Sequence, residues 1–144
     1  MSSMIRKLEA TDYSKYLLLI NDFRPTDFSE EQFITTLNEI NNSSVIYVLE
    51  SEEQFLATAT IQYETKFIFN ISKLAHIEDV CVKKEYRTQG LGKQILQHCI
   101  EAAKSAGAYK ITLDCADHNI PFYLKCGFEK RGTQMTILLK EPIS

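Results

Sequence analysis

The stretch from Glu78 to Gly92 constrains the fold most, because it joins an apolar, strand-like run to a long helix through a loop with two glycines. The loop reads Arg87-Thr88-Gln89-Gly90-Leu91-Gly92, and a pattern with one apolar face runs from Gly90 to Ala106. Glycine lets a backbone turn tightly and approach a ligand. Because free N–H groups and the helix dipole favour anions at a helix N-terminus, this junction predicts a phosphate site.

Basic side chains surround this junction in a chain whose net charge is −3. They are Lys83, Lys84, Arg87 and Lys93. A pyrophosphate group fits such a site, although a glycine-rich turn that merely caps a helix remains the structural alternative. Two other phosphate motifs fail. The P-loop pattern needs Ser or Thr after the lysine, and the dinucleotide fingerprint needs a third glycine where Ile95 stands.

The remaining pattern predicts an α/β domain spanning residues 1–144, with helices around a central sheet. Strands are expected over residues 4–8, 45–49, 55–62, 75–82, 109–113 and 135–139, with one more short strand near Phe128. Helices are expected from Thr11 to about Arg24, after a capping box at Ser29, over 90–106 and over 120–125. The apolar run Phe67-Ile68-Phe69 is assigned to the core.

Composition excludes several classes of function. An acidic pI near 5.6 argues against a general nucleic-acid binder, and no apolar run is long enough to span a membrane. The four cysteines, Cys81, Cys99, Cys115 and Cys126, lack metal-ligand spacing, so we expect small buried thiols and no metal site. The N-terminus has no secretory pattern, and we therefore expect a cytoplasmic protein.

Four further blocks around the glycine loop resemble the glucosamine 6-phosphate N-acetyltransferases of the GNAT superfamily. They are Lys66-Phe67-Ile68, His76-Ile77-Glu78-Asp79-Val80, the strand Tyr109 to Cys115, and the stretch from Asn119 to Phe128. The resemblance covers about Ile5 to Ile137. It implies a GNAT-like fold with a mixed, mostly antiparallel sheet. It also implies a homodimer whose sugar site is shared between the chains.

The same resemblance implies an enzyme that transfers the acetyl group of acetyl-CoA to the 2-amino group of glucosamine 6-phosphate. Attack is direct, in a ternary complex, and the product feeds UDP-GlcNAc biosynthesis. Asp114 would orient and polarise the amine, and Tyr123 would donate a proton to the departing thiolate. The acidic pair Glu78 and Asp79 would lie at the sugar site with Asp114 and Lys66, and Arg24 is placed to reach it. The residues implied for acetyl-CoA are Val80, Cys81, Val82, Arg87, Thr88, Gln89, Gly90, Leu91, Gly92, Asn119, Phe122, Tyr123 and Lys125.

Structural roles are the alternatives for these residues. Asp114 could simply end a strand, Tyr123 could be a core aromatic, and Glu78-Asp79 could mark a sheet edge. The three histidines, His76, His98 and His118, have no partner in the pattern and are interpreted as structural or solvated. The family also carries an arginine on its last strand, whereas this chain reads Met135-Thr136-Ile137-Leu138-Leu139. That departure keeps open acetyl transfer to another small amine. A domain that only binds CoA or a partner is a third hypothesis, and the presence of Asp114 and Tyr123 argues against it.

Overall fold

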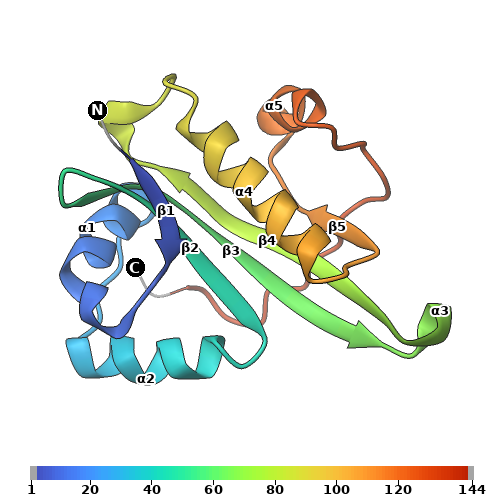
Figure 1. The fold of residues 1–144 in the computed structure, drawn as a ribbon, viewed down its shortest axis with the longest axis horizontal. Helices are drawn as coiled ribbons and strands as arrows, with labels where there is room; N and C mark the ends of the chain where they lie inside the picture. Colours follow the sequence, from blue (N-terminus) through green and yellow to red (C-terminus); the bar gives the residue numbers. More distant parts are fainter. Residues whose placement is uncertain (1–2, 143–144) are drawn as a thin grey trace.

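A five-stranded sheet forms the middle of the computed structural model, which describes residues 3–142 (Figure 1). Its strands are β1 (Met4–Lys7), β2 (Ser44–Ser51), β3 (Gln54–Lys66), β4 (Ser72–Val82) and β5 (Lys110–Leu113), and they lie side by side in chain order. The pairs β1–β2, β2–β3 and β3–β4 are antiparallel, whereas β4 and β5 are parallel. The predicted mixed, mostly antiparallel sheet is confirmed.

Helices cover both faces of this sheet. The longer ones are α1 (Tyr13–Phe23), α2 (Glu30–Ile40), α4 (Leu91–Ser105) and α5 (Ile120–Lys125); α3 (Ile68–Ile71) is a short turn, and 3-10 turns occur at Ala10–Asp12, Lys84–Tyr86 and Asp117–Asn119. Alternation along β2 separates two cores: Tyr47 and Leu49 pack with α4, while Ile46 and Val48 pack with α1 and α2. Among the described residues, no helix is both long and apolar enough to cross a bilayer.

Local sequence explains where α2 and α4 lie. The Ser29 hydroxyl accepts the Gln32 N–H at 3.1 Å, and the Gln32 side chain accepts the Ser29 N–H at 2.8 Å, so the predicted capping box is present. The inner side of α4 is fully buried at Ile95, Leu96, Cys99 and Ala103. That stripe fixes the long helix against the sheet, within one residue of its predicted bounds at each end.

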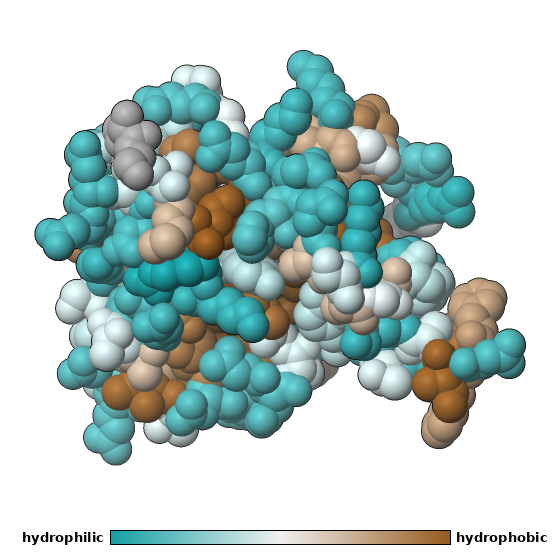
Figure 2. All heavy atoms as spheres, viewed as in Figure 1, coloured by the Kyte–Doolittle hydropathy of each residue, from teal (hydrophilic) through white to brown (hydrophobic). Residues whose placement is uncertain are grey.

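The β3–β4 hairpin extends farther than predicted, and its tip corrects one expectation. Phe67 is 92% exposed and Phe69 is 71% exposed, so this apolar run is not core. Figure 2 shows these side chains gathered at the protruding end of the hairpin, beside α3. Three consecutive non-glycine residues there, Phe69 to Ile71, adopt positive φ angles. Left-handed backbone is costly for a β-branched residue such as Ile71, and the tip is therefore strained.

The predicted strand over 135–139 and the short strand near Phe128 are absent, because residues 129–142 form no strand in the described structure. The segment instead runs from α5 across the molecule (Figure 1). Met135, Ile137, Leu138 and Leu139 are all exposed. A strand needs a neighbour for its backbone groups, and within one chain this segment has none.

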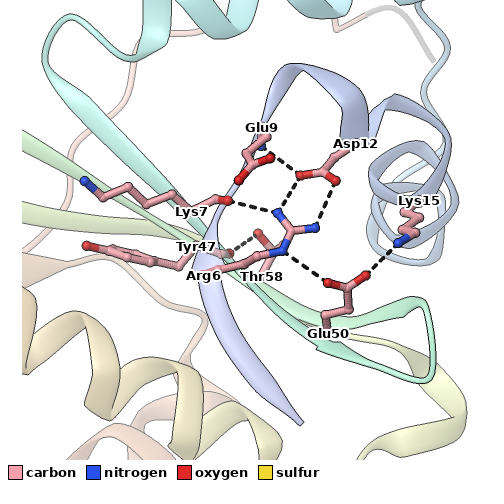
Figure 3. A network of polar contacts seen from close by, with 8 residues as sticks. All are labelled: Arg6, Lys7, Glu9, Asp12, Lys15, Tyr47, Glu50 and Thr58. Carbon is pink, nitrogen blue, oxygen red and sulfur yellow. Dashed lines mark hydrogen bonds and ion pairs between the residues drawn. The ribbon is translucent and has the colours of Figure 1, made fainter.

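An ion-pair network joins β1 to α1 and β2 (Figure 3). Arg6 donates two hydrogen bonds to the buried Asp12 carboxylate, at 2.8 and 3.0 Å, and a third to Glu50 at 3.1 Å. Lys15 reaches the other Glu50 oxygen at 2.6 Å. Burial alone would raise the pKa of Asp12, but the hydrogen bonds from Arg6 and from the Glu9 N–H hold it below its usual value.

Candidate active site

The two parallel strands separate at the centre of the molecule, and this leaves a backbone edge open. Pairing between β4 and β5 ends at Ile77 and Leu113, while β4 continues to Val82. In the described structure no strand pairs with Val80 to Val82 on the β5 side. An open edge of this kind can accept an extended ligand through main-chain hydrogen bonds.

A bulge in β4 sits just before this open edge. The register shifts between Thr58 and Thr60, so that Asp79 and Val80 together oppose one residue of β3. Asp79 has a positive φ of 53°. Bulges redirect side chains and are common beside active sites, and here the bulge carries one of the predicted sugar-site acids.

The glycine loop leads from that edge into α4 as predicted. Thr88 and Gly90 have positive φ angles, and α4 begins at Leu91 with Gly90 as its N-cap. Because Gly90 has no side chain to cap the helix, the first N–H groups of α4 point out of the helix end without a side-chain partner from the N-cap. Lys93 lies in the first turn, and the Arg87 side chain folds back to donate from Nε to the Val82 carbonyl at 3.3 Å. Loop and open edge are therefore adjacent, and their charge suits an anion.

Three elements meet at Gly92. A Cβ atom added there would lie 3.5 Å from Val82 and 3.6 Å from the ring of Phe122. The structure thus brings together β4, the start of α4 and α5, as the predicted acetyl-CoA residues require. Asn119 immediately precedes α5 and Lys125 ends it.

Tyr123 lies on the inner side of α5, half-buried against the α4 core and edge-on to Phe122 and Phe128. Burial raises the pKa of its hydroxyl, and the neighbouring Cys115 and Cys126 raise it further. The phenol is therefore protonated at neutral pH and can act as a proton donor. Tyr123 and Asp114 line the same open cavity of about 990 Å³, which runs beside β5.

Asp114 directly follows β5, and His76 lies beside it. His76 Nε2 is 3.7 Å from Asp114 Oδ2, and His76 Nδ1 is 2.8 Å from the Thr112 hydroxyl. Sequence interpretation treated this histidine as structural or solvated. Residues two apart share a face of a strand. His76 precedes Glu78 by two residues, and Thr112 precedes Asp114 by two, so strand alternation places these side chains on one face.

The predicted sugar-site residues do not gather in one place within a single chain. Arg24 and Asp79 line a second, apolar cavity of about 350 Å³ between α1 and α2. Tyr16 belongs to it, and burial together with the nearby Asp79 raises the pKa of its hydroxyl well above the usual range. Lys66 ends β3 beside α3, at the opposite end of the molecule from α1 (Figure 1), and pairs with Glu64 at 3.4 Å.

The cysteines supply no activated nucleophile in the core. Burial raises the pKa of the Cys81 thiol to about 11 and that of the Cys99 thiol to about 12. A neutral buried thiol is a poor nucleophile. Within residues 3–142 no group of three or more His, Cys, Asp or Glu side chains is arranged to hold a metal ion.

Comparison with known proteins agrees with this geometry. The model of the acetyltransferase (GNAT) family matches residues 4–128. "Glucosamine 6-phosphate N-acetyltransferase 1" of Dictyostelium discoideum is 37% identical over 95% of this chain and 91% of its own length. "Glucosamine 6-phosphate N-acetyltransferase" of Arabidopsis thaliana is 37% identical over 92% and 93%.

Solved structures extend the similarity to the fold. The crystal structure of glucosamine-6-phosphate N-acetyltransferase from Arabidopsis thaliana superposes with a TM-score of 0.92 at 35% identity, covering 97% of this chain and all of that one. The resemblance seen in the sequence blocks is confirmed. This chain belongs to the acetyltransferase (GNAT) family.

Proposed function

We propose that this protein transfers the acetyl group of acetyl-CoA to the 2-amino group of D-glucosamine 6-phosphate, giving N-acetyl-D-glucosamine 6-phosphate. One observation carries the proposal: the open edge of β4, the glycine loop at the start of α4 and the Tyr123 face of α5 converge at Gly92. The names of relatives that match over most of the chain support the acceptor.

Each converging feature suits one part of acetyl-CoA. The backbone of Val80 to Val82 pairs with the amide groups of the pantetheine arm. The loop from Arg87 to Gly92 holds the pyrophosphate on the α4 N–H groups, with Lys93 adding charge. Asn119, Phe122 and Lys125 flank the thioester end.

The transfer then requires two further groups. Asp114 accepts a hydrogen bond from the amine and orients its lone pair toward the thioester carbonyl. Tyr123 gives its proton to the sulfur as the C–S bond breaks, which avoids release of a free thiolate. Both side chains line one cavity beside β5.

A homodimer completes the sugar site in this proposal. Arg24 and Lys66 lie at opposite ends of one chain, so a second copy is needed to bring both charges to one sugar phosphate. The exposed apolar residues of the hairpin tip and of segment 135–139 offer the contact surface. The outer edge of β5, which borders the 990 Å³ cavity, offers a place for the partner's segment to pair.

Mass spectrometry of product formation tests the function. Purified protein is mixed with acetyl-CoA and glucosamine 6-phosphate, and parallel mixtures contain glucosamine, other small amines or no acceptor. Rapid N-acetylation of glucosamine 6-phosphate supports the proposal. A preference for an unphosphorylated amine would refute the acceptor, and acetyl-CoA binding without any product would refute the reaction.

A further inference from the structure

On the face of the sheet opposite α4, a cluster of polar side chains lies outside the area that α1 and α2 cover. His76 lies on it, since its neighbours Ala75 and Ile77 are buried against α4. The register places His76 beside Thr112 on β5 and beside Gln62 on β3. Asp114 follows on the same side, two residues after Thr112.

The contacts of His76 fix how its ring lies. Nδ1 and the Thr112 hydroxyl are 2.8 Å apart, and Nε2 faces the Asp114 carboxylate at 3.7 Å. If Nδ1–H donates to the Thr112 hydroxyl, a neutral ring presents the lone pair of Nε2 to Asp114 and can take up a proton there. Hydrogen bonds of catalytic groups are commonly long before substrate binds, and a small rotation of Asp114 closes this one.

Charged groups on three strands face this histidine. Glu78 shares its face on β4, Lys110 and Asp114 share it on β5, and Glu64 shares it on β3. Carboxylates predominate among these four side chains. The His76 side chain is 31% exposed, so a proton on the ring can leave to solvent.

We propose that His76 is a positioning residue for Asp114 and the acceptor of the proton that acetyl transfer releases. This inference rests on the proposed function. Thr112 orients the His76 ring, the ring orients the Asp114 carboxylate, and the carboxylate orients the acceptor amine. The arrangement needs no group beyond those already present in the site.

The proton balance shows why an acceptor is needed. The acceptor amine arrives as an ammonium, and one proton passes through Asp114 to His76. The neutral nitrogen then forms the C–N bond to the thioester carbonyl carbon. As the C–S bond breaks, sulfur takes the Tyr123 proton, and the second nitrogen proton restores the phenol. The products are the amide, the thiol of CoA and one proton, which His76 gives to solvent.

The variants His76→Gln and His76→Ala test this role, with His98→Gln as the matched control. His98 lies on α4, on the other face of the sheet, and packs edge-on against Tyr47 of β2 with 4.7 Å between the ring centroids. For both His76 variants kcat should fall about tenfold to a hundredfold, at or below the lower end of the usual contribution of acid–base catalysis, because His76 acts through Asp114. The KM for acetyl-CoA should be unchanged. The acid limb of the kcat–pH profile should move or vanish, and added imidazole should restore part of the His76→Ala rate. The control should match the parent.

Three outcomes would overturn the inference. These are a kcat near the parent value, an unmoved acid limb, or a loss of rate that appears only in KM. Circular dichroism and acetyl-CoA calorimetry check folding. Should the His76 variants not fold, Thr112→Val removes the hydroxyl that orients the ring and should lower kcat while leaving acetyl-CoA affinity unchanged; an unchanged kcat would count against the role. A parent protein that makes no product refutes the proposed function instead, so the two failures are distinguishable.

Discussion

At the scale of single residues, the site combines groups whose environments differ. Burial raises the pKa of Tyr123 and keeps it a donor, whereas Asp114 stands in a more open position at the end of β5. This difference suits the proposed roles of Tyr123 as acid and Asp114 as amine-orienting carboxylate. Acid and base roles are commonly assigned to paired groups from such differences in their environments.

Replacing Tyr123 by Phe should lower kcat by roughly tenfold to a thousandfold, because the departing sulfur then receives no proton from the protein. The ring keeps its contacts with Phe122 and Phe128, and acetyl-CoA affinity should be unchanged. Steady-state kinetics and calorimetry measure the two effects. Tyr109→Phe is the control, since Tyr109 lies outside the site and packs on Phe69. An unaltered kcat in Tyr123→Phe would refute the acid role.

Sequence patterns predicted these two residues only through the family resemblance. From local patterns alone, Asp114 is interpreted as the end of a strand and Tyr123 as a core aromatic residue of a helix. A single sequence does not indicate that the two side chains line the same cavity. The same limit applies to the contact between His76 and Thr112. The two residues are 36 apart in the chain, and only the parallel β4–β5 register brings them together.

At the scale of elements, the loop and the start of α4 were predictable because their signals are local. The glycine N-cap and the amphipathic stripe of α4, like the capping box of α2, each depend on residues that are close together in the sequence. The strand predicted over 135–139 is absent from the described structure, because an apolar pattern does not specify a neighbouring strand with which the segment could pair. The core assignment of the apolar run Phe67-Ile68-Phe69 at the hairpin tip was wrong for a related reason. An apolar run favours burial but does not indicate what would cover it.

Gly90→Arg should weaken acetyl-CoA binding strongly, because a long side chain would enter the space taken by the pyrophosphate. Gly107→Arg is a close control: its φ of 82° matches the 81° of Gly90, both sites have open space around Cβ, and it lies just beyond the other end of α4. Both variants should lose about 1–2 kcal/mol of stability to left-handed strain. Calorimetry should show lost acetyl-CoA binding only for Gly90→Arg; equal binding by both would mean that the loop is misplaced.

The network around Arg6 ties three elements together, and its removal should destabilise the fold. Arg6→Met leaves the buried Asp12 carboxylate without its main partner and should cost about 3 kcal/mol at neutral pH. Lys7→Met, an exposed neighbour on β1, should cost far less. Urea unfolding measures both changes.

The same network predicts how stability depends on pH. The pKa values of Asp12 and Glu50 are lowered in the folded state: burial opposes the shift at Asp12, and the hydrogen bond from Lys15 leads it at Glu50. Their contribution is present above the pKa of an unfolded carboxyl and is lost as pH falls through the folded values. Acid should therefore destabilise the parent more than Arg6→Met. If the stability of the parent and of Arg6→Met falls in parallel as the pH is lowered, the assignment of lowered pKa values to this network is contradicted.

At the scale of the whole molecule, one chain leaves apolar surface open at two places, the hairpin tip and segment 135–139. If the proposed homodimer forms through this surface, Ile137→Asp should convert it to a monomer and abolish turnover, because the proposed sugar site needs both chains. Leu18→Asp on α1 is the control, an exposed apolar residue outside that surface. Light scattering after gel filtration reports the mass. A parent protein that is already monomeric and fully active would contradict the shared site.

The ratio of kcat/KM for glucosamine 6-phosphate to that for glucosamine tests the central claim most directly. A site that binds the phosphate through charged groups should favour the phosphorylated sugar by about tenfold to a hundredfold or more, since each hydrogen bond to a charged group contributes about 1.5–3 kcal/mol. Magnetic resonance of the product should place the acetyl group on the 2-amino nitrogen. A ratio near unity, or acetylation at another position, would contradict the account.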